Sequence, residues 1–495
     1  MSVQHIFVLM LENRAFDHML GFSIINGRDA ETGESTRVNG LTGSESNVFN
    51  GSTYTVSQGA DLVMPADPGH EFTNVLEQLC GDMASYPPAG AYPAIDKSGF
   101  VASYAASGGS AAPGEVLKCF ASAQLPVLTA LAQEFAVCDN WHASMPGPTW
   151  PNRMFVHAGS SGGLDHSPKT EEIVLWETIG GFPFKSGTIF DALKKKGVSY
   201  RLYAGDDFPM VAALKGISLF DVHHYSEFAA DLGQAKFPYG YVFIEPSYDV
   251  LNEYRNSTSQ HPLTDITLGE GLIKETYEAI RNSALWETSV LLITWDEHGG
   301  FYDHVTPPPA VAPGDSQPND KHNQNGFTFE QYGPRVPAIV ASPLIPKNTI
   351  DHRLYDHASI PATIKAVFGA GPLTARDRQA NGLDRLLSLQ TARQDTPTIL
   401  PSPAAAAAHP VMSMAVRDLN TVVASRPEET VNQGTLPVII NSALRQDLEM
   451  SPEQRGQILK RVESLKTREQ AREYLAEVQT KVRARRAARD PRQTA

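Results

Sequence analysis

Short runs of apolar residues alternate with helical patterns along the first part of the chain. The runs Ile6–Leu11, Leu291–Trp295 and Ala338–Ser342 have the length of buried strands. Two stretches, from Leu125 to Phe135 and from Asp265 to Leu285, place apolar residues three and four positions apart, as amphipathic helices do. This alternation predicts an α/β fold, in which helices flank a central sheet.

The pattern changes after about Gln390. A segment rich in proline and alanine follows, and this composition predicts a linker because prolines disfavour regular structure. Beyond it, Ser451 is expected to cap a helix that has Pro452 in its first turn. A second helix is expected after Thr467, where TREQ has the form of a capping box. The chain therefore divides into a main domain at 1–390, a linker at 391–430 and a helical basic C-terminal region at 431–495.

Charge is unevenly distributed between these parts. From Ser451 to the end the chain has twelve Lys and Arg against six Asp and Glu, although the formal net charge of the whole is −14. The expected role of the C-terminal helices is a solvated appendage that packs on the main domain. The alternative is that the basic residues from Lys481 to Arg492 make a peripheral contact with an anionic membrane.

Composition narrows the classes of function. The acidic balance argues against a nucleic-acid partner, since such proteins gain affinity by neutralising phosphates. Cys80, Cys119 and Cys138 lack the spacing of a zinc site or a disulfide framework, so three buried or half-buried free thiols are expected. The N-terminal stretch MSVQHIFVLMLENR lacks the basic start and the cleavage site of a signal peptide. As given the chain is expected in the cytoplasm, and the alternatives that leave its localisation unknown are a signal that has been trimmed away and an export route that needs no cleavable signal.

Acidic and amide side chains follow two of the predicted strands. Glu12 and Asn13 come after the first run, while Asp296, Glu297 and His298 come after the run that ends at Trp295. Ligands of open α/β sheets bind at the carboxyl ends of strands, where these side chains would meet. Neighbouring carboxylates repel each other in a desolvated cleft unless a cation lies between them. The pattern therefore predicts one or more divalent metal ions with oxygen ligands, of unknown identity.

A second motif is MPGPTWPNRMFVHAGSS, Met145 to Ser161. Pro151 suits the first turn of a helix, which would place the Thr149 hydroxyl near a helix N-terminus that favours an anion. Threonine is a poor nucleophile unless a base or a metal activates it. The predicted metal would do so, which makes phosphoryl transfer through a phosphothreonine chemically coherent. The simpler interpretation is that Thr149 only caps the helix.

Several long segments, in this order, resemble a bacterial phosphoesterase family that contains phospholipases C and acid phosphatases. The resemblance covers about Gln4 to Gly369 and lies in HIFVLMLENRAFDHMLG, LPVLTALAQEFAVCDNWHASMPGPTWPNRMFVHAG, WDEHGGFYDHVTPP, YGPRVPAIVASP and DHASI. It implies an alkaline-phosphatase-like fold, with a central, mostly parallel sheet flanked by helices and, here, a small helical C-terminal appendage.

The resemblance also implies a role for each matching residue. Thr149 matches the nucleophile, and His70 and His261 match phosphate-binding histidines that are candidates for proton transfer. Asn13 matches a residue that contacts the phosphoryl oxygens or the metal, and His298 is a further phosphate-binding candidate. His304 and His357 lie in matching segments too, and they are expected either to support the site from outside or to be structural; Asp303 is a further candidate for the supporting role. The metal ligands would be Glu12, Asn13, Thr149, Asp296 and Glu297.

The favoured function is metal-dependent hydrolysis of phosphoric esters, of the phospholipase C type, with a phospholipid or small phosphate ester as substrate. An acid phosphatase that acts on monoesters is the first alternative. The second is a degenerate family member that binds without catalysis. A choline-selective site would need an aromatic cage, to which Trp141, Trp150 and Tyr248 are candidate contributors, although such aromatics more often lie in the core. Members of the family are often exported, and the absence of a signal in this chain departs from that habit.

Overall fold

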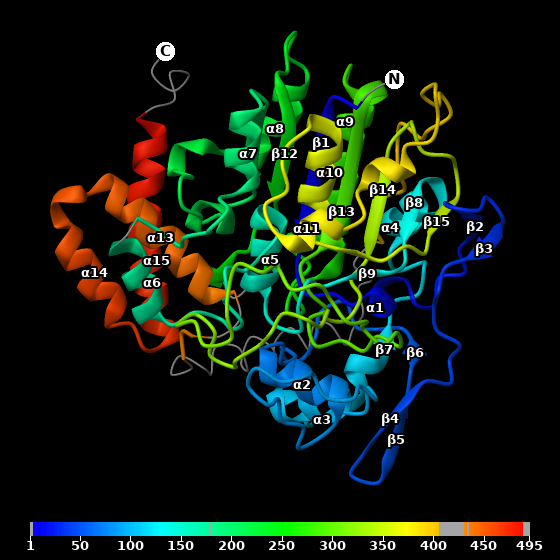
Figure 1. The fold of residues 1–495 in the computed structure, drawn as a ribbon, viewed down its shortest axis with the longest axis horizontal. Coiled ribbons are helices and arrows are strands. Elements are labelled where there is room, and N and C mark those ends of the chain that lie inside the picture. Colours follow the sequence, from blue (N-terminus) through cyan, green and yellow to red (C-terminus); the bar gives the residue numbers. More distant parts are fainter. Residues whose placement is uncertain (1–2, 179, 253, 405–429, 433–434, 489–495) are drawn as a thin grey trace.

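A computed structural model describes residues 3–178, 180–252, 254–404, 430–432 and 435–488. Within these residues, ten strands form the central sheet in the order β11-β10-β12-β1-β13-β14-β8-β15-β2-β3 (Figure 1). In that order they span Val222–His224, Ser199–Ala204, Tyr239–Glu245, His5–Leu11, Ser289–Trp295, Ala338–Ala341, Ala136–Cys138, Thr349–Asp351, Asn26–Asp29 and Ser35–Arg37.

The sheet is mostly parallel, as the resemblance implies. β1 pairs in parallel with β12 on one side and with β13 on the other. The exceptions are β14, antiparallel to both of its neighbours, and β3, antiparallel to β2. All residues of β1 and β13 are buried, which explains why both read as continuous apolar runs.

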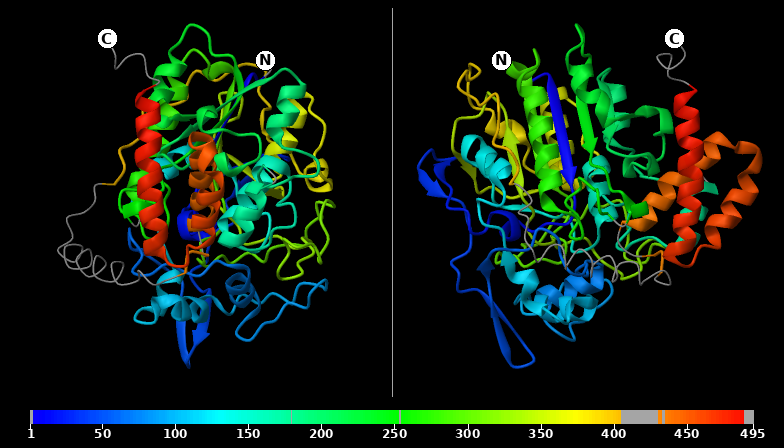
Figure 2. Two further views of the ribbon diagram at one scale, coloured as in Figure 1. Left: turned by 90° about the vertical axis from the view of Figure 1, so that its left-hand side faces the viewer. Right: turned by 180° about the vertical axis from the view of Figure 1, so that it is seen from behind.

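Helices cover both faces of the sheet, and the views from the front and from behind show one group on each face (Figures 1 and 2). The predicted strands at 6–11, 291–295 and 338–342 and the helices at 125–135 and 265–285 are confirmed within a few residues. One group is α4 (Pro126–Glu134), α8 (Phe228–Leu232) and α9 (Ile266–Arg281), and the other is α5 (Thr149–Ala158), α7 (Ile189–Lys195) and α10 (Ser359–Phe368).

A separate layer covers the carboxyl ends of the parallel strands, at the lower end of Figure 1. It has its own apolar core, which includes Phe100 and Val101 and also Phe301 from the segment after β13. The layer consists of β4 (Ser46–Phe49), β5 (Ser52–Thr55), α2 (Phe72–Cys80) and α3 (Phe100–Tyr104). The smaller elements are α1 (Phe16–Leu20), β6 (Ser57–Gln58), β7 (Lys118–Cys119), β9 (Trp141–His142), α6 (Thr170–Thr178), β16 (Tyr355–Asp356) and α11 (Ala375–Gln379).

The C-terminal region forms three helices, α13 (Leu436–Met450), α14 (Arg455–Glu463) and α15 (Arg468–Ala487), at the left of Figure 1. Thr467 forms the predicted capping box with Gln470. Ser451 occupies the predicted N-cap position, with Pro452 in the first turn, but it begins a short 3₁₀ turn, Pro452–Gln454, and its hydroxyl makes no capping hydrogen bond. The α-helix α14 begins only after this turn. The apolar faces of α13 to α15 share a core with α5 and α6, so the helices pack on the main domain.

The predicted linker falls partly outside the described residues, which lack 405–429. Its first part lies against α9, where the Tyr277 hydroxyl and Lys274 Nζ donate to the carbonyls of Pro397 and Leu400. The three cysteines are free thiols, with Cys80 half-buried and the other two buried, as expected.

None of the helices in the described ranges is both long and apolar enough to cross a membrane.

Candidate active site

The ends of β1 and β13 bring the predicted acidic residues together. Because Leu11 pairs with Trp295 in parallel register, Glu12 and Asn13 emerge beside Asp296 and Glu297. The Asn13 N–H donates to Asp296 Oδ1 at 3.0 Å. All four side chains are fully buried. The chain passes so closely here that a Cβ on Gly299 would lie 2.1 Å from the Asn13 carbonyl oxygen, and Gly299 has φ +65°, which explains the glycine after DEH.

Thr149 is the first residue of α5, and its hydroxyl points at Asn13. Pro148 is the N-cap residue, and the Thr149 hydroxyl donates instead to Asn13 Oδ1 at 3.2 Å. The interpretation of Thr149 as a simple helix cap is therefore wrong. The hydroxyl lies at the N-terminus of a ten-residue helix, where free N–H groups and the helix dipole favour an anion.

His70 and His298 flank Glu297. His70 Nδ1 lies 3.0 Å from Asn13 Nδ2 and 3.3 Å from Glu297 Oε1. His298 Nδ1 lies 3.3 Å from Glu297 Oε2, while its Nε2 is 2.7 Å from Gln78 Oε1. Burial opposes protonation of His70, but the neighbouring carboxylates outweigh it and raise the pKa of His70 overall. Asn13 therefore links Thr149 to His70 in one buried network.

His261 lies beside this network and interacts electrostatically with His70 and Asp67. Its Nε2 lies 3.6 Å from Asp67 Oδ2, and its Nδ1 accepts the Leu263 N–H at 3.3 Å. The ring stacks on Tyr254 with centroids 4.0 Å apart and planes 5° apart. Burial lowers the pKa of His261 to about 4, so the ring is neutral at pH 7. The structure thus gathers the predicted residues at one edge of the sheet, and their roles stay predictions.

Two buried carboxylates at this edge, Glu12 and Asp296, have raised pKa values, and Arg153 is the arginine that pairs with Asp296 among the described residues. Burial, reinforced by Asp296, raises the pKa of Glu12 to about 8. Burial also raises the pKa of Asp296 to about 6, against the lowering effect of Arg153. Arg153 donates from Nε to Asp296 Oδ2 at 2.9 Å and from Nη2 to the Leu11 carbonyl at 3.0 Å. One buried arginine therefore faces three buried carboxylates.

The residues at the strand ends fit a divalent cation. Among the described residues, Oε2 of Glu12 is buried and has no hydrogen-bond partner, and the buried Oε1 of Glu297 has only the 3.3 Å contact with His70 Nδ1. Unpartnered carboxylate oxygens in a desolvated site are costly, and a cation would relieve that cost. The available donors are carboxylate, amide and hydroxyl oxygens, which hard divalent ions prefer.

A second cluster of acidic residues follows Glu12 and Glu297 closely in the sequence, but a buried arginine pairs with its acids. Among the described residues, Asp17, Asp303 and His304 form a group whose ligand atoms all lie within 4.8 Å of one another, closer together than the predicted metal ligands. Arg335 already pairs with both acids, through Nη2 to Asp17 Oδ1 at 2.9 Å and through Nε to Asp303 Oδ1 at 2.8 Å. Because their charge is neutralised, this group fits a structural ion-pair network better than a metal.

Three residues at the site carried no signal in the sequence analysis: Arg153, Gln78 and Thr435. Arg153 stands in the NRMFVHAG segment, one helical turn after Thr149, and that spacing could have placed it on the same face of α5. Thr435, whose hydroxyl donates to Glu12 Oε1 at 2.8 Å, lies in a different region of the chain and could not have been found from spacing. His357 supports Asp296 from outside as expected, because its Nε2 lies 2.6 Å from the Asp296 carbonyl oxygen.

The aromatic candidates for a choline cage belong to the core. Trp141 stacks on Tyr355, Trp150 packs edge-on against Trp176, and all of these rings are buried. Tyr248 is fully buried as well, with the Arg153 guanidinium 5.6 Å from its ring centre.

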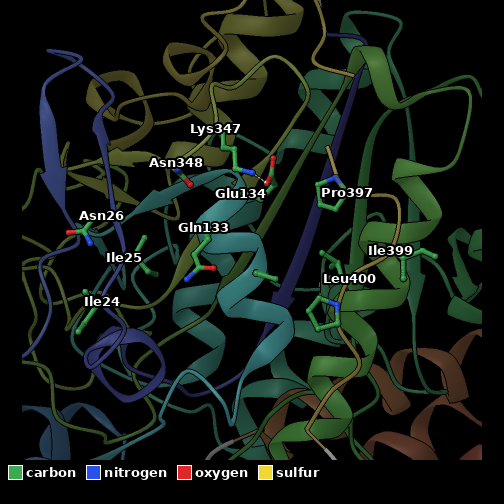
Figure 3. Close-up of a pocket in the computed structure, with 12 residues that line it drawn as sticks. Ile24, Ile25, Asn26, Gln133, Glu134, Lys347, Asn348, Pro397, Ile399 and Leu400 are labelled. Carbon is green, nitrogen blue, oxygen red and sulfur yellow. Dashed lines mark ion pairs between the residues drawn. The ribbon is translucent and has the colours of Figure 1, made fainter. Parts of the chain in front are cut away.

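A pocket of about 570 Å³ lies away from these residues, between α4, the start of β2 and the segment 397–401 (Figure 3). Lys347 and Glu134 form an ion pair of 2.7 Å along its wall. The pocket contains no predicted catalytic residue.

Comparison with known proteins places the chain among phosphoesterases. The model of the Phosphoesterase family matches residues 3–371. Non-specific phospholipase C6 of Arabidopsis thaliana is 36% identical over 418 residues, which cover 81% of this chain and 75% of the relative. Non-specific phospholipase C3 of the same plant is also 36% identical, over 81% of this chain and 76% of the relative. Phospholipase C B of Mycobacterium tuberculosis is 29% identical over half of each chain.

Solved structures align only distantly. They include a protein in the alkaline phosphatase superfamily from Vibrio parahaemolyticus, with TM-score 0.33 and 12% identity over 76% of this chain and 77% of that one. Similarity at this level adds nothing to the assignment. The plant relatives show that the description of the family as bacterial was too narrow. With the family model over most of its length and plant relatives above 30% identity, the chain belongs to the Phosphoesterase family and is a phosphoric ester hydrolase.

Proposed function

We propose that this enzyme is a metal-dependent phospholipase C that acts through a phosphothreonine intermediate. The observation that carries the proposal is the position of the Thr149 hydroxyl, at the N-terminus of α5 and hydrogen-bonded to Asn13 among the buried carboxylates. The names of the relatives, phospholipases C of plants and of Mycobacterium tuberculosis, support the substrate class.

Metal dependence is supported by the chemistry of the strand ends. Glu12, Asn13, Thr149, Asp296 and Glu297 would hold the ion. When bound, a divalent cation would supply positive charge that lowers the pKa of the threonine hydroxyl and stabilises the phosphoryl oxygens. Within the described residues, no carboxylate or imidazole is hydrogen-bonded to the Thr149 hydroxyl, and the Asn13 amide that accepts from it cannot take its proton.

The chain's own groups would then carry two transfers. In the first, the Thr149 hydroxyl loses its proton to solvent and Oγ1 forms a bond to phosphorus. The bond from phosphorus to the diacylglycerol oxygen breaks, and the leaving alkoxide takes a proton from His70 or from the Nε2–H of the neutral His261, which is then reprotonated from solvent. In the second, a water oxygen attacks the same phosphorus and releases the phosphorylated head group, which restores the threonine hydroxyl. The N–H groups at the start of α5 stabilise the charge on the phosphoryl oxygens in both steps.

The substrate class can be tested with three compounds. A phospholipase C should release diacylglycerol from phosphatidylcholine and cleave para-nitrophenyl phosphorylcholine with a higher kcat/KM than para-nitrophenyl phosphate. The acid phosphatase alternative predicts the reverse preference between the two chromogenic esters. A folded protein that turns over none of the three would support the non-catalytic alternative and contradict the proposal.

The proton donor can be identified by comparing leaving groups. Nitrophenolate leaves without help, whereas a diacylglycerol alkoxide needs a proton. Removal of the true donor, in His70→Asn or His261→Asn, should therefore cost far more activity on phosphatidylcholine than on para-nitrophenyl phosphorylcholine. A histidine that only binds phosphate should lose both activities alike.

Membrane contact through the basic C-terminus is a separate proposal with weaker support. Lys481 lies 3.0 Å from Asp447, and Arg483 lies 2.9 Å from Asp207, so part of the charge of α15 is already paired. The end of the predicted basic stretch lies outside the described residues, which stop at 488. Vesicle sedimentation with and without phosphatidylserine would test it.

A further inference from the structure

A residue of the C-terminal region reaches a predicted metal ligand. The hydroxyl of Thr435, at the start of α13, donates to Glu12 Oε1 at 2.8 Å, across 423 positions of sequence. Thr435 is 1% exposed and Glu12 is 0% exposed, so water does not compete for this bond. A hydrogen bond from a buried donor to a carboxylate is among the stronger ones in proteins.

The bond leaves the two oxygens of Glu12 in different situations. Oε1 accepts from Thr435, whereas Oε2 is buried and has no hydrogen-bond partner in the part of the chain that the structure describes. Thr435 also interacts with the hydroxyl of Tyr254, whose ring stacks on His261. The Thr435 hydroxyl therefore interacts both with Glu12, at the end of β1, and with Tyr254, whose ring stacks on His261.

The position of Thr435 is fixed by the packing of α13. Val438 and Ile439, just after it, are buried in the same apolar core as Trp150 and Met154 of α5, the helix that begins with Thr149. Further along α13, Gln446 Nε2 donates to the Asp207 carbonyl at 3.0 Å. The start of α13 is thus anchored in the core to which the helix that presents the predicted nucleophile also contributes.

We infer that Thr435 is a positioning residue of the active site, which orients Glu12 so that Oε2 stays free for the cation. The inference rests on the metal site of the proposed function. Partners that orient metal ligands commonly contribute about 10- to 100-fold to metal affinity or activity. The C-terminal region would then be part of the catalytic unit.

The test combines hydroxyl removal with a double-mutant cycle. Thr435→Val removes the donor at nearly constant volume, and Thr435→Ser keeps the donor. Ser442→Ala is the matched control, because it removes another buried hydroxyl of α13 that has no contact with Glu12. Mn²⁺ affinity is measured by isothermal titration calorimetry, and kcat is measured on para-nitrophenyl phosphorylcholine.

Thr435→Val should weaken Mn²⁺ binding about tenfold and lower kcat, while Thr435→Ser and Ser442→Ala stay close to the parent. In a Glu12→Gln background the valine substitution should add less than about a twofold change, because its effect passes through the lost carboxylate. An equal loss in both backgrounds, or parent-like affinity and kcat in Thr435→Val, would overturn the inference.

Folding of the variants is checked by circular dichroism and thermal unfolding. If Thr435→Val does not fold, Thr435→Ala, which adds no bulk, takes its place. Failure of both to fold would show that the hydroxyl is structural and would overturn the inference. If the parent enzyme binds no metal, that result contradicts the proposed function and not this inference. The double-mutant cycle of Thr435 and Glu12 then tests the inference through kcat alone.

Discussion

The Thr149 hydroxyl donates to Asn13 Oδ1 at 3.2 Å, although 136 positions of sequence separate the two residues. This contact places the predicted nucleophile beside the carboxylates at the ends of β1 and β13. We predict that Thr149→Ala lowers kcat by roughly three orders of magnitude or more, because no other group can form the covalent intermediate. Thr149→Ser should keep substantial activity.

Rapid quenching and mass spectrometry should detect phosphate on residue 149 during turnover, as phosphothreonine in the parent and phosphoserine in Thr149→Ser. Thermal unfolding of the alanine variant controls for folding. An alanine variant that retains more than about a tenth of the parent rate would require a water nucleophile.

The metal prediction concerns Glu12 and Asp296. Burial, which disfavours the charged form, and a neighbouring carboxylate raise their pKa values to about 8 and about 6. Exhaustive chelation should abolish activity, and added divalent metal should restore it. Glu12→Gln and Asp296→Asn should each weaken metal binding by roughly a hundredfold, since ligand charge sets the affinity. Full activity in chelated protein that contains no metal by mass spectrometry would contradict this prediction.

Much of the fold could be predicted from local sequence patterns, whereas the candidate site could be predicted from them only in part. β1 and β13 were predictable because both faces of each strand are buried, so the apolar runs are continuous. Glu12 and Asp296 were predictable because they follow those runs directly. The contact of Thr435 with Glu12 was not, because it depends on how α13 packs into the core that it shares with α5 and α6, and no pattern within these segments encodes that packing.

Arg153 gives a prediction about stability. It is buried and donates to Asp296 Oδ2 at 2.9 Å. Arg153→Met should lower the free energy of unfolding by about 3–5 kcal/mol, because it leaves a buried carboxylate without its partner. Divalent metal should recover part of this loss, since a cation bound to Asp296 replaces the missing charge.

Urea unfolding with metal and with chelator measures both effects. Arg461→Met is a control, because Arg461 pairs at the surface with Glu477, where ion pairs contribute about 1 kcal/mol or less. A similar small loss in Arg153→Met would contradict the prediction.

His157 gives a prediction about pH. Its ring centre lies 4.7 Å from that of Phe243, its Nδ1 has no hydrogen-bond partner among the residues described, and burial lowers its pKa to about 3. The folded state therefore binds this proton less readily than the unfolded state, so the contribution of His157 to stability is present above about pH 6.5 and is lost as pH falls toward 3. His157→Phe should reduce the slope of unfolding free energy against pH by up to about 1.4 kcal/mol per pH unit in that range.

Urea unfolding at pH 4.5, 5.5, 6.5 and 7.5 would show this change in slope. His224→Phe is a control, because His224 is exposed. An unchanged slope in His157→Phe would mean that the imidazole is protonated in the folded protein or that other groups dominate the acid response.

The last prediction separates the two roles considered for the C-terminal helices. Val462, Leu475 and Val478 are buried in the core that α13 shares with Trp150 of α5. Truncation before Ser451 removes these side chains, each of which contributes about 1.5–3 kcal/mol by burial, and should loosen α13 and its contact with Glu12. Since displacements of about 1 Å can cost a hundredfold in rate, activity on para-nitrophenyl phosphorylcholine and on vesicles should fall together, with a lower Tm.

Arg485→Glu changes the charge of an exposed position on α15 and should leave both activities unchanged. If the truncated enzyme keeps its activity on the soluble ester and loses only activity on anionic vesicles, or if Arg485→Glu does the same, the helices serve membrane contact and not the integrity of the active site.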